Sequence, residues 1–173
     1  MHSTEETPQK ELILYIVRHA EAGQHGDPRY SDDSLRPVTK DGRKRFRCLV
    51  KKMARRGFEP AVIATSPFVR CRQTAEVIAK RGRGKAELVE LAELEPLSQL
   101  EALLKWTTEQ PSGQIAWVGH APDVSILLGQ LIGADPESIG FAKGAIAAIK
   151  FSGTIAPGKG HLVWLVTPKA MGC

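Results

Sequence analysis

A chain of 173 residues has about the length of one domain and can bury a core without disulfides or metals. Hydrophobic residues make up 42% and charged residues 25%, which excludes a disordered chain and a fibre. The longest apolar run, residues 12–17, is far shorter than a membrane span. Residues 1–10 are polar and lack the apolar stretch of a signal peptide. We therefore expect a polar N-terminal tail over 1–10 and a single cytoplasmic domain over 11–173.

The net charge of +5 is concentrated in one segment. Residues 40–56 contain nine Lys or Arg and one acid, whereas the rest of the chain has 15 basic and 18 acidic residues. Four apolar residues recur there at helical spacing, namely Phe46, Leu49, Val50 and Met53. The pattern predicts a helix with Thr39 as its N-cap and a solvated basic face. A second interpretation is an electrostatic landing surface for an acidic partner or a phosphate-rich ligand. Nucleic acid is not expected, because no aromatic residues are interleaved with the basic ones.

Strands and helices alternate along the chain. In order, we expect a strand at 12–17, a helix at 40–56, a strand at 61–65, a helix at 67–81, a strand at 86–91, a helix at 98–109, a strand at 115–118, a helix at 122–132, and strands at 145–151 and 161–166. Ser66 and Pro67 suit the N-cap and first position of the second helix. This alternation predicts an α/β fold, a three-layer α/β/α sandwich around a mainly parallel sheet. The last two strands are joined by a Gly/Pro-rich turn, which predicts an antiparallel hairpin at the sheet edge.

Three polar clusters each follow an apolar strand directly. They are Arg18-His19, the segment 66–70 (SPFVR) and Gly119-His120. The carboxyl ends of parallel strands share one edge of the sheet, where ligands bind in such folds. We therefore expect His19, His120, Arg18 and Arg70 to meet at one place.

Two histidines and two arginines favour phosphate chemistry over a metal site. A zinc site needs three or four ligands, and arginine is not one of them. Arginine forks match the oxygens of phosphate instead. Cationic neighbours favour the neutral form of an imidazole, which is a nucleophile. The cluster predicts metal-independent phosphoryl transfer through a phosphohistidine, with no cofactor.

The motifs around these residues resemble those of the histidine phosphatase superfamily, which has the phosphoglycerate mutase-like fold. The family signature Arg-His-Gly corresponds here to Arg18-His19-Ala20. The backbone at residue 20 must therefore have room for the Cβ of alanine. The similarity is greatest to the SixA-type phosphohistidine phosphatases. It runs through residues 14–22 (LYIVRHAEA), 35–39 with Gly42, 66–70 with 73–75, 93–96 and 118–120.

The resemblance implies a role for each matching residue. His19 would be the phosphorylated nucleophile, Arg18 and Arg70 would bind the phosphoryl oxygens, and His120 would complete the pocket. Arg36 would lie at the pocket rim and contact the phosphate or its leaving group. The alternative for Arg36 is a loop arginine that holds the turn before the basic helix.

The candidate for the general acid, which would protonate the leaving group, is Glu93. Many superfamily members protonate the leaving oxygen with a carboxylate after a later strand, and Glu93 is nearest to that place. The alternative is that Glu93 caps or pairs locally. The resemblance to the SixA type implies that no dedicated acid is needed, because an imidazole leaves readily once protonated whereas an alkoxide needs its proton supplied.

The other polar residues receive structural interpretations. His25 is interpreted as loop decoration, and Asp27, Asp32 and Asp33 as a solvated loop. Cys48, Cys71 and Cys173 are widely spaced and show no metal-ligand pattern. Cys71 is a poor rival nucleophile, because the phosphate-binding Cys-x5-Arg loop of tyrosine phosphatases is absent.

The leading functional prediction is a monomeric phosphatase acting on phosphohistidine in a protein, such as a phosphotransfer domain. One alternative is a phosphatase for small phosphate monoesters. A phosphoglycerate mutase ranks third, because the connections look too short for a lid. A different class is a non-catalytic module that binds a phospho-ligand or an acidic protein. No membrane partner is expected.

Overall fold

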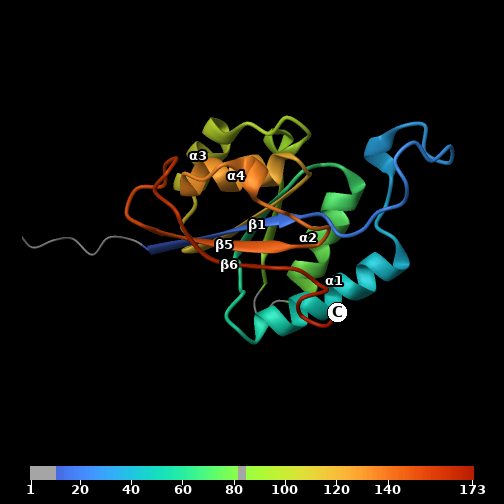
Figure 1. The fold of residues 1–173 in the computed structure, drawn as a ribbon, viewed down its shortest axis with the longest axis horizontal. Coiled ribbons are helices and arrows are strands. Elements are labelled where there is room, and N and C mark those ends of the chain that lie inside the picture. The colour runs from blue at the N-terminus through green and yellow to red at the C-terminus, as the bar shows by residue number, and fades with distance from the viewer. Residues whose placement is uncertain (1–10, 82–84) are drawn as a thin grey trace, which may run out of the picture.

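The computed structural model describes residues 11–81 and 85–173 and shows one sheet with helices on both faces (Figure 1). The predicted tail over 1–10 lies outside the described residues. The strands are β1 (Glu11–Arg18), β2 (Val62–Thr65), β3 (Glu87–Glu90), β4 (Gln114–Gly119), β5 (Ile146–Ser152) and β6 (His161–Val166). The helices are α1 (Lys40–Ala54), α2 (Val69–Arg81), α3 (Leu100–Thr108) and α4 (Asp123–Ile132), with short 3-10 turns η1 (Asp33–Leu35), η2 (Ala92–Leu94) and η3 (Pro136–Ser138).

The six strands lie in the order β3-β2-β4-β1-β5-β6. The pairs β1–β4, β2–β4 and β2–β3 are parallel, whereas β5 is antiparallel to both β1 and β6. The predicted α/β/α sandwich and the antiparallel hairpin at its edge are both confirmed. Because β1, β2 and β4 run parallel, their carboxyl ends lie at one edge of the sheet.

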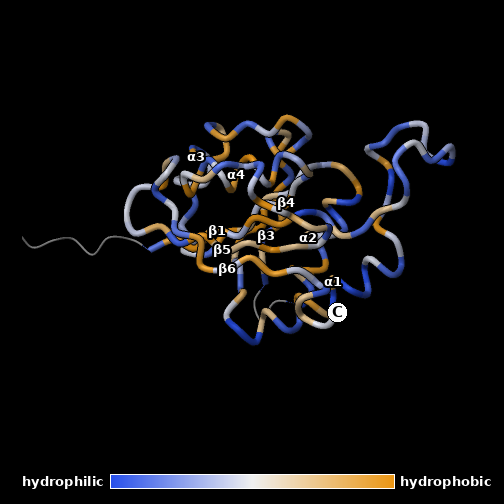
Figure 2. The backbone as a smooth tube through the Cα atoms, viewed as in Figure 1, coloured by the Kyte–Doolittle hydropathy of each residue, from blue (hydrophilic) through white to orange (hydrophobic). Residues whose placement is uncertain are grey.

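Both faces of the sheet are buried. Along β1, Leu14 and Ile16 pack in the cluster under α3 and α4, whereas Tyr15 and Val17 pack against α1 and α2. Figure 2 shows the apolar strands at the centre and hydrophilic segments around them. This double burial explains the near-continuous apolar runs of the inner strands.

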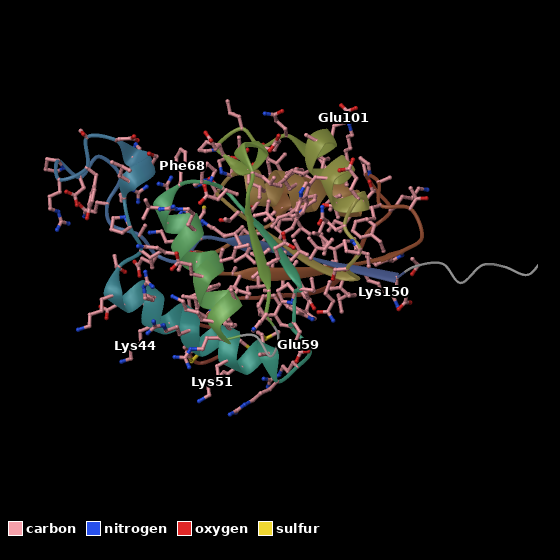
Figure 3. All side chains as sticks on the ribbon, turned by 180° about the vertical axis from the view of Figure 1, so that it is seen from behind. Lys44, Lys51, Glu59, Phe68, Glu101 and Lys150 are labelled. Carbon is pink, nitrogen blue, oxygen red and sulfur yellow. A yellow bond between two sulfur atoms is a disulfide. The ribbon has the colours of Figure 1, made fainter. Side chains whose placement is uncertain are left out.

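The basic segment forms α1 as predicted. Thr39 caps it, because its Oγ1 accepts a hydrogen bond from the Gly42 amide at 2.9 Å. The apolar stripe from Phe46 to Met53 is buried, and Figure 3 shows Lys44 and Lys51 pointing away from the sheet. The helix ends at Ala54, two residues before the predicted end.

The start of α2 differs from the prediction. The helix begins at Val69, because the first carbonyl to accept a helical hydrogen bond is that of Phe68, from the Arg72 amide at 3.1 Å. Ser66 is therefore not the N-cap. Its hydroxyl accepts from the Phe68 amide at 3.3 Å and lies 2.9 Å from Nε2 of His120. The hydroxyl therefore contacts both the turn that precedes α2 and a histidine of the site.

The other two helices begin one or two residues later than predicted, a usual difference at helix ends. Across residues 11–81 and 85–173, none of the helices has the length and apolarity needed to cross a membrane.

A disulfide that the sequence analysis did not predict fixes the C-terminal segment. Cys48 of α1 is bonded to Cys173 across 125 residues of sequence, and Figure 1 shows the C-terminus beside α1. Lys52 adds a hydrogen bond from Nζ to the carbonyl of Met171 at 2.6 Å. Spacing alone cannot reveal a pair so far apart in the chain.

We expect Cys48→Ser to lower the free energy of unfolding by about 2–4 kcal/mol, because a crosslink between distant residues restricts the unfolded chain. Urea unfolding without reductant measures this difference. Dithiothreitol should destabilise the wild type by a similar amount and leave Cys48→Ser unchanged. A wild type that is equally stable with and without reductant would contradict the prediction.

Candidate active site

The ends of β1 and β4 place two histidines side by side. Arg18 stands opposite Gly119 in the parallel register, and the His19 amide donates to the Gly119 carbonyl at 3.0 Å. The rings of His19 and His120 lie with their centroids 5.6 Å apart, edge to face. The chain then leaves β1 for α1 and β4 for α4, which cover opposite faces of the sheet. A crevice results at this switch point.

This crevice, which we call the histidine cleft, has a volume of about 870 Å³. Its lining includes all four residues predicted to meet, Arg18, His19, Arg70 and His120, together with Arg36. Among the described residues, no three His, Cys, Asp or Glu side chains gather where they could hold a metal ion.

His19 is held in one tautomer. Its Nδ1 lies 2.7 Å from the Ala20 carbonyl, which can only accept a hydrogen bond, so Nδ1 carries the proton and Nε2 the lone pair. Burial, together with the charges of Arg70 and Arg18, lowers the pKa of His19 to about 4. The imidazole is therefore neutral and nucleophilic at neutral pH.

Ala20 stands where the family signature has glycine. It is buried in the apolar cluster on the α1 side of the sheet, which also contains Phe46. Its amide donates to Thr74 Oγ1 at 3.0 Å. The methyl group of Ala20, which a glycine would lack, is therefore buried in the core beside the cleft.

Arg18 and Arg70 retain unused hydrogen-bond donors. Arg18 Nη1 donates to the Phe141 carbonyl at 2.7 Å, and Arg70 Nη1 donates to the Asp33 carbonyl at 2.8 Å. The Nε atoms of both arginines are buried and have no partner among the described residues. A buried donor without a partner is costly, so the two guanidinium groups together favour an anionic ligand.

The loop of Asp33 was predicted to be merely solvated, and this interpretation is wrong for Asp33, whose carboxylate pairs with residues of the cleft. Its carboxylate lies 2.9 Å from Nε of Arg36, 3.0 Å from Nη2 of Arg70 and 3.1 Å from Nδ1 of His25. Burial raises the pKa of Asp33, but the Arg36 hydrogen bond and the Arg70 charge outweigh it and hold the pKa at about 2. An internal anion thus already pairs with two arginines of the cleft.

Arg36 has the loop-holding contacts of one predicted interpretation and the position of the other, while its contact with phosphate stays a prediction. It lines the histidine cleft, and it also ties the loop together by hydrogen bonds to Asp33 and to the Gly23 carbonyl. His25 lies on the rim of the same cleft with its side chain 85% exposed. The spacing of Asp33 and Arg36 by three residues was the one sequence signal that could have indicated this pair.

Phe68 is a site residue that the sequence analysis missed. Its ring lies edge to face with His120 at 4.9 Å, and the Arg70 guanidinium lies 5.0 Å from the ring centroid. Figure 3 shows Phe68 at the N-terminal end of α2. Its position there lets one ring contact both an arginine and a histidine of the cleft.

His120 is neutral as well. Burial, together with the charge of Arg70, lowers the pKa of His120 to about 3. Cys71 lies close to it but is an inert thiol, because burial raises the pKa of Cys71 to about 12. This agrees with the interpretation of Cys71 as a poor nucleophile.

Glu93 lies beside the cleft rather than in its lining. It is half-buried on η2, and its carbonyl accepts from the Gln99 amide at 2.9 Å. Of the described residues in this segment, Pro96 lines the cleft. Lys143, which the sequence analysis did not single out, is exposed and lines the cleft from the turn before β5.

Comparison with known proteins shows to which family the chain belongs. Residues 14–98 match the model of the histidine phosphatase superfamily (branch 1). An uncharacterised protein of Picosynechococcus sp. is 34% identical over 116 residues, which cover 65% of this chain and 68% of the relative. The chain belongs to the histidine phosphatase superfamily. It is accordingly a phosphatase.

Within the histidine phosphatase superfamily, SixA proteins are similar along nearly the whole chain. Phosphohistidine phosphatase SixA of Escherichia coli K12 is 25% identical over 160 residues, covering 91% of this chain and 94% of that protein. The solved structure of the protein histidine phosphatase SixA complexed with tungstate superposes with a TM-score of 0.79 at 24% identity, covering 91% of this chain and 98% of that one. The fold predicted from the sequence is that of this superfamily.

The role of Asp33 can be tested with inorganic phosphate. We expect Asp33→Asn to strengthen inhibition by phosphate about five-fold, because the carboxylate competes for Arg36 and Arg70 and repels an incoming anion. The measurement is the inhibition constant of phosphate against para-nitrophenyl phosphate. Asp32→Asn is the matched control, since Asp32 only caps η1 through the Ser34 amide. Weaker phosphate inhibition in Asp33→Asn would contradict the competition.

Proposed function

We propose that the protein hydrolyses phosphohistidine on another protein through a phosphoryl group carried transiently by His19. The observation that supports this most directly is the hydrogen bond from His19 Nδ1 to the Ala20 carbonyl. It leaves Nε2 as a neutral nucleophile in a cleft lined by guanidinium groups.

The same residues suit each step of the reaction. Nε2 of His19 attacks the phosphorus, the bond from phosphorus to the substrate nitrogen breaks, and the departing imidazole takes up a proton. Arg18, Arg70 and His120 bind the oxygens on which negative charge develops. Water then attacks the phosphorus, the bond to Nε2 breaks, and inorganic phosphate leaves with His19 restored.

The carboxylates of the cleft favour a phosphohistidine substrate over an ester. Asp33, with its pKa at about 2, holds no proton to donate at neutral pH. Glu21 also lines the cleft, but its carboxylate is bound by Arg45 at 2.9 Å. An imidazole leaving group needs less help from a protein acid than an alkoxide does.

The similarity to SixA supports the same substrate. The relative from Escherichia coli is a phosphohistidine phosphatase, and it matches nearly the full length of the chain. A SixA protein also forms a complex with tungstate, a tetrahedral oxyanion like phosphate. The arginines of the histidine cleft offer donors for such an ion.

We expect His19→Ala to abolish turnover, because the nucleophile is lost. Rapid quenching of the wild type during the reaction should trap a phosphoryl group on His19 that is labile to acid and stable to base. His161→Ala is the control, since His161 is an exposed residue of β6 at the far edge of the sheet. A fully active His19→Ala protein would refute the phosphohistidine mechanism.

Glu93→Gln tests the substrate class. We expect only a slight loss of activity on phosphohistidine, because the leaving imidazole acquires its proton readily. On an alkyl phosphate ester the same change should cost roughly 100-fold if Glu93 is the acid. The quantity to measure is the ratio of the two effects at one pH. A large loss on phosphohistidine itself would favour a small-ester phosphatase with a dedicated acid.

A further inference from the structure

A second cavity lies beside the histidine cleft. This side pocket has a volume of about 620 Å³, within the usual range for ligand sites. Its apolar lining includes Ala20, the residue after the proposed nucleophile, with Phe46 of α1, Ala142 and Pro168. The phosphatase mechanism uses none of these side chains.

The side pocket and the histidine cleft share part of their walls. Glu21 and Lys143 line both cavities, so the two hollows adjoin on either side of these two residues. A ligand with its phosphoryl group at His19 can therefore extend past Lys143 into the side pocket.

One wall of the side pocket is fixed in place. It is formed by residues 167–173, which the disulfide from Cys48 to Cys173 and the bond from Lys52 to the Met171 carbonyl tie to α1. Gly144 lines the pocket with φ +72°, and a Cβ there would lie 3.3 Å from both Phe46 and Pro168. The absence of this side chain keeps the space open.

The rim of the side pocket is basic. Arg45, Lys143 and Lys169 line it, and of the described lining residues only Glu21 has an acidic side chain. That carboxylate is already paired with Arg45 at 2.9 Å. Arg45 belongs to α1, whose exposed basic residues include Lys44 (Figure 3). An apolar floor under a positive rim fits an apolar side chain flanked by acidic residues.

We infer that the side pocket binds a segment of the phosphorylated protein substrate, with an apolar side chain in the pocket and acidic residues against Lys143 and Lys169. The inference rests on the proposed function and adds a sequence preference to it. It gives the basic rim of the side pocket a specific task, which is to recognise the acidic surroundings of the phosphorylated histidine.

The test compares two synthetic phosphohistidine peptides, one with Leu and Glu beside the phosphohistidine and one with Ser and Lys. Phosphoramidate, which has no flanking residues, serves as the reference substrate. We expect the wild type to hydrolyse the Leu/Glu peptide with a kcat/KM about ten-fold higher than that of the Ser/Lys peptide, each value taken relative to phosphoramidate.

Two substitutions separate charge from shape. Lys169→Glu should reduce the preference for the Leu/Glu peptide about five-fold or more and improve the Ser/Lys peptide, because it reverses a charge on the rim. Ala142→Phe should reduce the preference by filling the pocket. Lys105→Glu is the matched control, since Lys105 is exposed on α3, which covers the other face of the sheet. It should retain the full preference.

The outcomes distinguish this inference from the proposed function. Equal rates on both peptides, or an unchanged preference in Lys169→Glu and Ala142→Phe, would overturn the inference while leaving phosphohistidine hydrolysis intact. A wild type that hydrolyses para-nitrophenyl phosphate but neither peptide would overturn the proposed function and this inference together.

Discussion

The parallel register between β1 and β4 sets Arg18 opposite Gly119. Since His19 and His120 are the next residues on the two strands, this register brings the two histidines side by side. The hydrogen bond from the His19 amide to the Gly119 carbonyl extends this pairing one step beyond β1. A shift of one residue in this register would turn every side chain of β1 to the opposite face. The buried alternation of Leu14 and Ile16 against Tyr15 and Val17 prevents that shift, because both faces pack against helices. Core packing and site geometry therefore depend on the same pairing.

The positive charge of the cleft determines the protonation of its other groups. Three arginines line it. Burial and the arginine charges together keep His19 and His120 neutral, whereas Arg36 and Arg70 keep Asp33 ionised against the effect of its burial. Asp33 offsets part of this charge by pairing with Arg36 and Arg70. A phosphate that enters the cleft competes with Asp33 for the same donors. The unused Nε donors of Arg18 and Arg70 show that Asp33 does not saturate the guanidinium groups of the cleft.

Helix α1 contributes both to the boundary of the histidine cleft and to the wall of the side pocket. Its buried stripe packs on the sheet, and its Arg45 pairs with Glu21 at the boundary of the two cavities. Cys48 on the same helix fixes the C-terminal residues that wall the side pocket. One helix therefore positions a wall of the side pocket, while the exposed lysines on its outer side remain available for contact with an acidic partner.

Much of the fold follows from local sequence patterns. Apolar runs of strand length alternate with amphipathic segments, and this alternation predicted the three-layer sandwich, the hairpin at its edge and the strand ends at which His19, Arg70 and His120 meet. Such patterns suffice because burial on both faces of a parallel sheet dictates residue type position by position. Helix ends were predicted less well: Ser66 looked like an N-cap, but its hydroxyl contacts His120 from a distant strand.

The tertiary structure alone decided the contacts between segments that are far apart in the chain. The polar loop that holds Asp33 gives no sign that it folds back onto Arg70, since its composition is that of any solvated loop. The pairing of Cys48 with Cys173 and the meeting of Phe68 with His120 have no local signature either. Residue type and spacing record the chemistry that a chain can perform and the elements that it forms. Which loop closes over which strand end depends on the packing of the whole chain, because that packing alone brings charges distant in sequence within reach of one another.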